Sequence, residues 1–482
     1  MVASFVGRTQ ELAVLTKRLD RVVRDGRGVA VTIRGRRQVG KSRLVQEFID
    51  RAGLPYFFYT ATKQMPSPES TSSLLAELAE SSLPPQPELI PTHTPATWPD
   101  VWRILTSALP TGPSIVVIDE LPWLTEQDEL FDGAMQTAWD RLLAGRPVLL
   151  LLLGSDLHMM ERLTAYDRPF YGRADHLVLN PLNPAEVGTA LSLPPADAID
   201  AHLVTGGLPG ILPSWPDGMP ALDFLRQECA DPAAAVFTIP EVTLQAGFPA
   251  PDQTRQVLEA IAGDARTQAN IASTAGSRRG PLPSGTLSPL LRRLVEDKRV
   301  LAVDQPLSTQ PGRPALYRVA DSNLRLYLAA LRPAHALTAR GRTAAAYTLV
   351  EQRWSSWRGR AVEPVIRESL ELAAAAGALP WPNAGAVGGW WNRRFDPEID
   401  IVGADTAPVA HSIFFVGSVK WHTSPVDARD VAALRRSAAS IPGVDPARCG
   451  YVVASLAGRQ EHTDPDSADV WWGAPEVVSA WA

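Results

Sequence analysis

Residues 29–48 have the sequence VAVTIRGRRQVGKSRLVQEF and decide the fold. The first five, 29–33, are apolar and mostly β-branched, which predicts a buried parallel strand. The last residues are apolar at helical spacing, which predicts a helix. Between them, residues 35–42 fit the phosphate-loop pattern G-x-x-x-x-G-K-[ST], which is meaningful only between a strand and a helix. The stretch therefore predicts an anion-binding turn.

The chemistry of this turn explains its spacing. Glycines let the backbone curl until its N–H groups face phosphate oxygens, and the positive end of the helix adds to the attraction. Lys41 is expected to reach the β- and γ-phosphates of ATP, and the Ser42 hydroxyl to bind Mg²⁺. The predicted nucleotide-binding residues are Gly35, Arg36, Arg37, Gln38, Val39, Gly40, Lys41, Ser42 and Arg43.

A second nucleotide signal is SIVVIDE at residues 114–120, an apolar strand that ends in two acids. Asp119 is expected to hold Mg²⁺, directly or through water. Glu120 is expected to polarise the water that attacks the γ-phosphate. An acidic pair at a strand end is common, but here it follows a phosphate loop with a strand and a helix between.

Two further candidates lie downstream. The apolar strand 147–153 ends near Ser155, which predicts either a γ-phosphate sensor or a small turn-forming residue. Arg173 precedes another short strand, 176–179. It could neutralise transition-state charge in its own or a neighbouring subunit, or be a solvated surface arginine.

Two segments have alternative interpretations of their own. Residues 5–8, FVGR, precede a helix and predict either a helix cap or a backbone cradle for adenine. The predominantly helical region 181–215 contains the turn TGGLP. There Pro209 could pack on the adenine from a helical lid, or the turn could simply join two helices. Residues 231–251 are expected to form an irregular boundary.

Composition limits the possible classes. The chain has 482 residues, a length typical of about three domains, and a net charge of −6, so as a whole it is not a polyanion binder. Its two cysteines argue against a disulfide scaffold or zinc site. No signal-peptide pattern begins the chain, and the longest apolar run, 148–153, is too short to span a bilayer. We expect a cytoplasmic protein without a membrane partner.

The fold class predicted from the alternating strands and helices is α/β, with a parallel sheet covered on both faces and nucleotide at the carboxyl ends of its strands. Residues 254–261, 268–275 and 288–296 predict three short helices, the last capped at Ser288-Pro289. Strands at 300–303 and 315–319 would complete a winged helix. The candidate DNA contacts near its recognition helix and wing are Arg278, Arg279, Arg292, Arg293 and Arg313. The alternative is a lid or a protein-contact module.

The C-terminal part predicts a separate α/β unit. A helix is expected over 343–376, a Pro/Gly loop over 380–389, and strands over 393–402, 413–421 and 450–454. A helix over 427–441 separates the last two strands.

The chain resembles the archaeal-type ATPase family, within the AAA-like and STAND-related P-loop NTPases. The motifs that carry the resemblance are VGRTQEL, IRGRRQVGKSRLV, VVIDELPWL, LGSDLHMM, PFYGR and GGLP, followed by YRVAD near the hairpin. The resemblance implies a P-loop ATPase core at 1–180, a helical lid at 181–250, a winged helix at 251–335 and a nuclease-like domain at 336–482.

The last domain of this family resembles restriction endonucleases of the PD-(D/E)xK type, in which an Asp and a Glu-x-Lys hold a metal and the attacking water. Here Glu363, Asp400 and Lys420 match. Ser418 stands where the Glu of Glu-x-Lys is expected, and a hydroxyl is a poor substitute for a magnesium-binding carboxylate. The resemblance therefore implies a degenerate domain.

Three functions follow as hypotheses. The leading one is a Mg²⁺-dependent ATPase that works as a nucleotide-controlled DNA-binding or regulatory switch, with protein partners or as a homo-oligomer. The second is a signalling scaffold that retains ATP or ADP with little turnover. The third is an ATP-gated nuclease.

Overall fold

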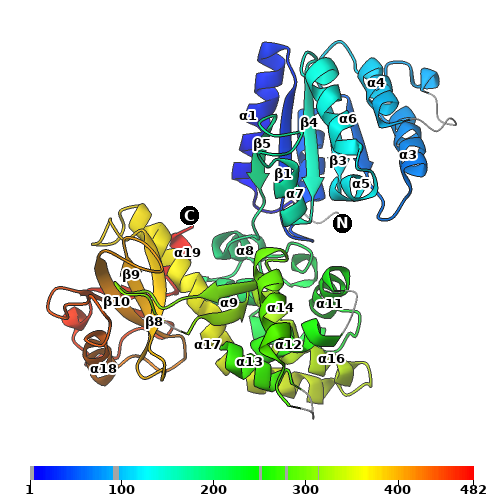
Figure 1. Ribbon diagram of the computed structural model, residues 1–482. Helices are drawn as coiled ribbons and strands as arrows, with labels where there is room; N and C mark the ends of the chain where they lie inside the picture. The colour runs from blue at the N-terminus through cyan, green and yellow to red at the C-terminus, as the bar shows by residue number, and fades with distance from the viewer. Residues whose placement is uncertain (1–4, 91–96, 249–251, 277–279, 313, 482) are drawn as a thin grey trace. The chain divides into compact units, whose positions relative to one another are not determined.

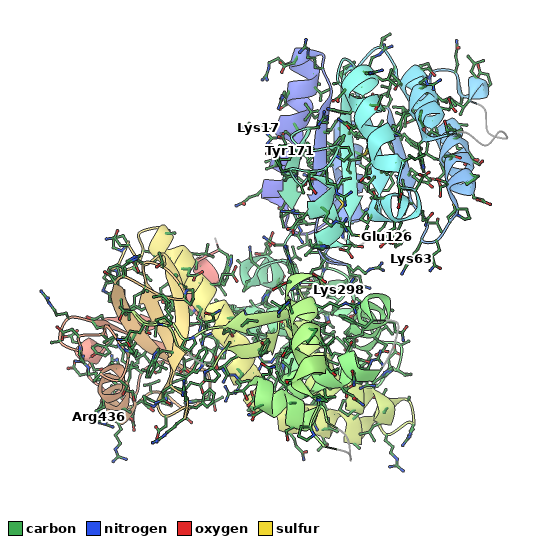
Figure 2. The ribbon with its side chains drawn as sticks, viewed as in Figure 1. Lys17, Lys63, Glu126, Tyr171, Lys298 and Arg436 are labelled. Atoms are coloured by element: carbon green, nitrogen blue, oxygen red, sulfur yellow. The ribbon has the colours of Figure 1, made fainter. Side chains whose placement is uncertain are left out.

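The computed structural model describes residues 5–90, 97–248, 252–276, 280–312 and 314–481 (Figure 1). The chain forms two compact units, Met1–Pro181 and Leu182–Ala482. In both units, charged side chains such as Lys63 and Arg436 point outward from the surface (Figure 2). Each unit is treated separately below.

The first unit is built on a five-stranded sheet in the order β2-β3-β4-β1-β5, and every neighbouring pair is parallel. This confirms the predicted P-loop sheet. The central strands β1, β3 and β4 are almost wholly buried, as their Val, Ile and Leu content requires. The strands are β1 (Val29–Arg34), β2 (Tyr56–Thr60), β3 (Ser114–Asp119), β4 (Val148–Gly154) and β5 (Ala174–Val178).

Helices cover both faces of this sheet (Figure 1). Alternate residues of a strand point to opposite faces, so Val31 and Leu151 belong to one core cluster, with α1 and α2, while Val116 and Leu150 belong to another, with α3, α4 and α6. The helices are α1 (Thr9–Asp25), α2 (Lys41–Ala52), α3 (Ser67–Glu80), α4 (Trp98–Ala108), α5 (Pro122–Gln127), α6 (Phe131–Ala138) and α7 (Leu157–Leu163), with short turns at Pro87–Leu89 and Trp139–Leu143.

The second unit begins with the helices α8 (Pro184–Leu191), α9 (Pro195–Thr205), α10 (Ala221–Glu228) and α11 (Ala235–Gly247), and a short turn at Leu212–Ser214. The expected irregular boundary at 231–251 is therefore wrong where the structure describes it. Pro240 lies inside α11, where it removes one backbone hydrogen bond. Buried Val236, Phe237 and Leu244 hold the helix in place.

The next elements follow the predicted order of three helices and an antiparallel hairpin. The expected cap at Ser288-Pro289 is wrong, because the third helix starts four residues earlier and Pro289 lies within it. The elements are α12 (Asp252–Ala262), α13 (Gln268–Thr274), α14 (Ser284–Glu296), β6 (Leu301–Asp304) and β7 (Leu316–Val319).

The loop between β6 and β7 docks on the C-terminal sheet. The Leu307 N–H donates to the Gly389 carbonyl at 2.9 Å, and the Ala410 N–H donates to the Ser308 carbonyl at 2.9 Å. Leu307 is 1% exposed and belongs to the same core cluster as Trp390. The loop of the hairpin therefore contributes Leu307 to the hydrophobic core of the C-terminal sheet.

The C-terminal sheet has the order β12-β11-β10-β9-β8, with β10, β11 and β12 parallel and β8, β9 and β10 antiparallel. Two boundaries differ from prediction: β8 begins inside the expected 380–389 loop, and residues 392–397 form a turn before β9. The elements are α15 (Ser322–Leu326), a turn at Tyr327–Leu331, α16 (Arg332–Thr338), α17 (Thr343–Ala375), β8 (Ala386–Trp391), β9 (Glu398–Ala404), β10 (Ile413–Lys420), α18 (Ala428–Ala438), β11 (Gly450–Ser455), a turn at Pro465–Ser467, β12 (Val470–Trp472) and α19 (Ala474–Ser479).

Candidate nucleotide site

The phosphate loop joins β1 to α2, as its sequence predicts. Gly35 has no room for a side chain, because a Cβ there would lie 2.5 Å from the Leu179 carbonyl oxygen. Gln38 adopts a left-handed φ of 63°, which bends the chain sharply before α2 begins at Lys41. The N-terminus of α2 thus faces the centre of the loop, where an anion is favoured.

Lys41 spans the loop from within. Its Nζ donates to the Gly35 carbonyl at 2.9 Å and to the Arg36 carbonyl at 3.1 Å. Burial lowers the pKa of Lys41, while Glu120 and Asp119 oppose that shift. The side chain is 6% exposed and close to both acids of the β3 end, so loop and acids form one electrostatic group.

Ser42 and Asp119 meet at the carboxyl edge of the sheet. The Ser42 Oγ donates to Asp119 Oδ2 at 2.6 Å. A hydroxyl and a carboxylate side by side are the hard oxygen ligands that Mg²⁺ takes when phosphates and waters supply the rest of its shell. Across the described residues, no group of three or more His, Cys, Asp or Glu side chains could hold a metal ion.

Glu120 has a strained position and one clear partner. Its φ is 53°, and its backbone N–H donates to Asp119 Oδ1 at 2.8 Å. The Ser155 Oγ, just beyond β4, lies 2.9 and 2.8 Å from the two carboxylate oxygens of Glu120. The structure thus brings together the predicted water-activating acid and the predicted sensor.

Arg173 pairs with Asp140 and not with Asp119 or Glu120. It makes two hydrogen bonds to Asp140, both 2.8 Å, and two more to the carbonyls of Pro169 and Tyr171, both 2.9 Å. The hydrogen bond to Asp140 raises the pKa of Arg173 and lowers that of Asp140. All of the guanidinium nitrogens are therefore engaged within the first unit.

The N-terminal segment supplies a contact that sequence reasoning did not find. Arg8 is 4% exposed, and its Nη2 donates to the Val39 carbonyl in the phosphate loop at 3.0 Å. A groove of about 520 Å³ is lined by Phe5, Gly7 and Thr9, together with side chains of α1 and α2. Both interpretations of residues 5–8, as a helix cap and as a backbone cradle for adenine, stay predictions. The only signal for Arg8 was an arginine at a helix start where a small polar cap is usual.

The GGLP turn packs on the start of α15. A Cβ at Gly206 would lie 2.7 Å from Asp321 Oδ1, and the Asn323 side chain donates to the Val204 carbonyl at 2.8 Å. This close approach explains the glycine at position 206. Pro209 is half-buried beside the turn, and its contact with adenine stays a prediction.

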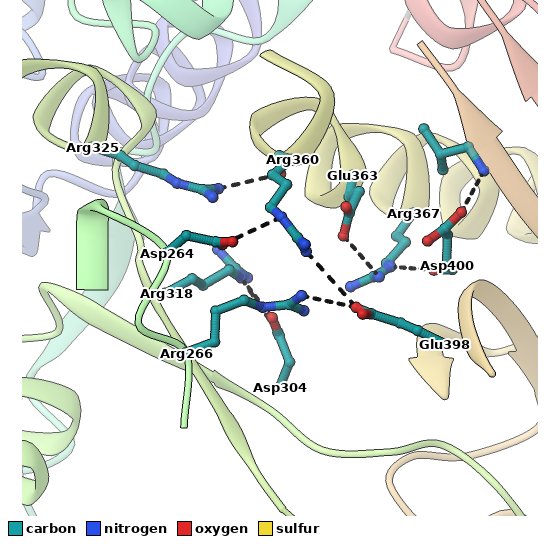
Figure 3. Close-up of polar contacts among 11 residues, drawn as sticks. Asp264, Arg266, Asp304, Arg318, Arg325, Arg360, Glu363, Arg367, Glu398 and Asp400 are labelled. Carbon is teal, nitrogen blue, oxygen red and sulfur yellow. Dashed lines mark hydrogen bonds and ion pairs between the residues drawn. The ribbon is translucent and has the colours of Figure 1, made fainter. Parts of the chain in front are cut away.

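Arg367 contacts two of the nuclease-like residues, Glu363 and Asp400 (Figure 3). Arg367 donates from Nη2 to Glu363 at 3.3 Å and from Nε to the Asp400 carbonyl at 2.8 Å, while Val419 N–H donates to Asp400 Oδ2 at 2.8 Å. Burial raises the pKa of both acids. Lys420 instead pairs with Asp430 at 3.0 Å.

These acids border a charged cluster between the hairpin, α17 and β9. Arg266, which precedes α13, pairs with Glu398 of β9 at 2.8 Å, whereas Arg318 and Asp304 pair at 3.1 Å within the hairpin, between β7 and β6. The arginines that line this small pocket are Arg266, Arg318, Arg325, Arg360 and Arg367. Charges that the sequence scatters over 100 residues are thus largely neutralised by one another.

The predicted DNA contacts are only partly described. Arg292 and Arg293 lie on α14 and are exposed. Arg278, Arg279 and Arg313 lie outside the described residues. Of the five predicted DNA contacts, Arg292 and Arg293 are the two that the structure describes.

Comparison with known families divides the chain. Residues 4–150 match the AAA ATPase domain family. Residues 327–431 match a family of archaeal and bacterial proteins of unknown function. None of the curated proteins compared matches the chain.

Solved structures give distant similarities. The Walker-type ATPase of Pyrococcus abyssi is 19% identical, with a TM-score of 0.48, covering 67% of this chain and 96% of that one. Cdc6p from Pyrobaculum aerophilum is 14% identical, with a TM-score of 0.34, covering 73% and 97%. The Orc1 protein of Aeropyrum pernix, solved in complex with DNA, is 15% identical, with a TM-score of 0.35, covering 69% and 94%.

In the described part of the chain, no helix combines the length and apolarity needed to cross a bilayer. The phosphate loop, the acidic β3 end and the family match together cover the same stretch of sequence. Residues 4–150 are therefore similar to AAA ATPase domains, and they include strands β1, β2 and β3 of the parallel five-stranded sheet.

Proposed function

We propose that this protein is a Mg²⁺-dependent ATPase. The observation that supports it best is the convergence of Lys41, the Ser42–Asp119 pair and the Glu120–Ser155 pair at one edge of the sheet. A lysine for phosphate, two oxygens for a hard cation and a carboxylate for water are the parts that phosphoryl transfer requires.

The chemistry assigned to the chain is simple. The backbone N–H groups of the loop and Lys41 hold the β- and γ-phosphates. A water oxygen attacks the γ-phosphorus, the bond to the β–γ bridging oxygen breaks, and the water gives its proton to Glu120, leaving ADP and phosphate. Ser42 and Asp119 would hold Mg²⁺, which supplies charge neutralisation at the phosphate oxygens.

Ser155 controls the availability of Glu120 in this proposal. The Ser155 hydroxyl has one proton, shared between the two Glu120 oxygens, so it takes up part of the carboxylate's capacity to accept hydrogen bonds. In this proposal Glu120 turns away from Ser155 before it activates water. A hydrogen bond from the Ser155 hydroxyl to the γ-phosphate of bound ATP would release Glu120.

Phosphate release by the purified chain with ATP and Mg²⁺ tests hydrolysis. Release that depends on Mg²⁺ and on Glu120 supports the ATPase. ADP retained through purification, without turnover under any stimulus, would favour the signalling scaffold instead.

We also propose that nucleotide state controls DNA contact through α14. Replacing Arg292 and Arg293 with Ala is expected to reduce the slope of log affinity against log salt by about 2, because each lost phosphate contact contributes about 1. Fluorescence anisotropy with duplex DNA measures this. Arg340→Ala with Arg342→Ala, two exposed arginines in another turn of the same unit, is the control. Equal slopes in both double variants would point to a protein-contact module.

We propose that the C-terminal domain has no nuclease activity. The expected result is no cleavage of plasmid DNA with Mg²⁺ or Mn²⁺, with or without ATP, because Arg367 engages Glu363 and Lys420 pairs with Asp430. Cleavage by the wild type that disappears in Asp400→Ala would establish the ATP-gated nuclease. Trace cleavage that persists in Asp400→Ala would identify a contaminant.

A further inference from the structure

The phosphate loop carries a cation that the proposed mechanism does not yet use. Arg37 lies between Gly35 and Lys41, and its guanidinium carbon is 5.9 Å from the ring centre of Trp123. Within the described residues, Arg37 has no ion-pair partner, whereas Arg173 has a carboxylate and two carbonyls. No acid among the residues that the structure describes therefore forms an ion pair with Arg37.

Trp123 is a fixed platform next to the catalytic acid. Trp123 follows Glu120 by three residues, and its backbone N–H donates to the Glu120 carbonyl at 3.0 Å. Its half-buried ring packs against the core cluster of α3, α4 and α6. A guanidinium resting on this ring lies beside the strand end that supplies Asp119 and Glu120.

The loop geometry places the same guanidinium near Lys41. The positive charge of Arg37 is one of the causes that lower the pKa of Lys41, so the two cations are near neighbours. A cation–π contact at a half-exposed site is weak compared with a two-fold hydrogen-bonded ion pair. Arg37 can thus leave its ring at small cost, whereas Arg173 must give up four hydrogen bonds.

We propose that Arg37 is a loop-borne arginine that neutralises charge on the γ-phosphate within its own subunit, with Trp123 as the positioning residue that holds it ready. This rests on the proposed ATPase function and deepens it. As the bond between the γ-phosphorus and the bridging oxygen breaks, the planar guanidinium offers paired N–H donors to the γ-phosphoryl oxygens. The chain then needs no arginine from a neighbour.

The test compares Arg37→Gln, Arg37→Lys and Trp123→Phe with the wild type. Arg37→Gln is expected to reduce kcat by ~10²-fold or more, as loss of one charge-stabilising donor does. Its preference for a non-hydrolysable ATP analogue over ADP, measured by calorimetry, is expected to fall by about tenfold, since only the γ-phosphate contact is lost. Arg37→Lys keeps the positive charge, so its kcat and its preference for the triphosphate analogue are expected to lie between those of the wild type and of Arg37→Gln. Trp123→Phe keeps a ring face for the guanidinium, so its kcat is expected to decrease less than that of Arg37→Gln.

Arg103→Ala is the control, because Arg103 is exposed on α4 and pairs with Asp100 one turn away. It is expected to match the wild type in both measurements, and thermal melting of each variant establishes that it is folded. The inference is overturned if Arg37→Gln keeps both the wild-type kcat and the wild-type preference for triphosphate. A wild type that binds nucleotide without hydrolysing it would remove the ATPase proposal, and the affinity ratio in Arg37→Gln would still decide the contact.

Discussion

Replacing Glu120 with Gln is expected to reduce ATP turnover by at least ~10²-fold while ATP binding is retained. The amide is nearly isosteric, so the bonds around β3 and Ser155 can persist, but it cannot accept the proton of the attacking water. Steady-state phosphate release and calorimetric titration with ATP measure the two properties separately.

Glu126→Gln is the matched control for this variant, because Glu126 is an exposed acid on α5, six residues further along the chain. Its turnover is expected to equal that of the wild type. Wild-type turnover in Glu120→Gln would mean that another group activates the water, and the role assigned to Glu120 would be wrong.

The largest expected effect on stability comes from the Asp200–Arg358 pair, which joins α9 to α17. Two hydrogen bonds of 2.6 and 2.7 Å connect them, and the side chains are 11% and 12% exposed. Asp200→Ala is expected to lower the free energy of unfolding of the second unit by about 3–5 kcal/mol, because Arg358 is left buried without its partner. Denaturant unfolding measures the change.

The same pair predicts non-additivity. Burial raises the pKa of Asp200 to about 6 even beside Arg358, so the cost of removing the carboxylate from water exceeds the attraction between the partners. Replacing both residues by apolar ones of similar volume is therefore expected to cost much less than either single change. Asp223→Ala, which removes an exposed one-turn pair at 3.8 Å, is expected to cost at most about 1 kcal/mol. A double variant as unstable as the sum of both single variants would contradict this account.

The first unit could be predicted from sequence because its signals are local. Runs such as residues 148–153 have little choice but a buried strand, and the residues at both ends of β1 and β3 carry their chemistry with them. Parallel strands place their carboxyl ends at one edge, so Ser42, Asp119 and Ser155 were expected to meet before their contacts were known. Contacts with nucleotide are a step that sequence and fold alone do not supply.

The second unit was harder because long-range packing overrides local signals there. Residues 231–251 were expected to form an irregular boundary, but buried Phe237 and Leu244 keep α11 helical on both sides of Pro240. The hairpin loop looked like a free wing, yet Leu307 is buried in a core formed by residues 80–160 positions later. No periodicity in the sequence encodes that contact.

Arginines gave the least reliable guide. The sequence assigned no role to Arg266 and Arg318, which pair with acids from β9 and β6 (Figure 3). The sequence assigned no role to Arg367, which pairs with Glu363, because a glutamate and an arginine four residues apart on a helix usually form a solvated pair. The partners of a charge depend on tertiary structure, so composition alone could not separate these cases.

The docked hairpin also limits how the proposed switch works. Leu307 of the hairpin loop is buried in the core of the C-terminal sheet, and Arg266, before α13, pairs with Glu398 of that sheet. We therefore expect nucleotide state to move these modules together, with α14 as the surface that changes partners.

Calorimetric titration of the purified chain with ATP and Mg²⁺ tests the central claim most directly. We expect saturable binding at or below about 1 mM ATP, lost in Lys41→Ala because the loop then lacks the buried ammonium group that reaches the β- and γ-phosphates. Absence of binding by the wild type at that concentration, or equal binding by Lys41→Ala, would contradict it.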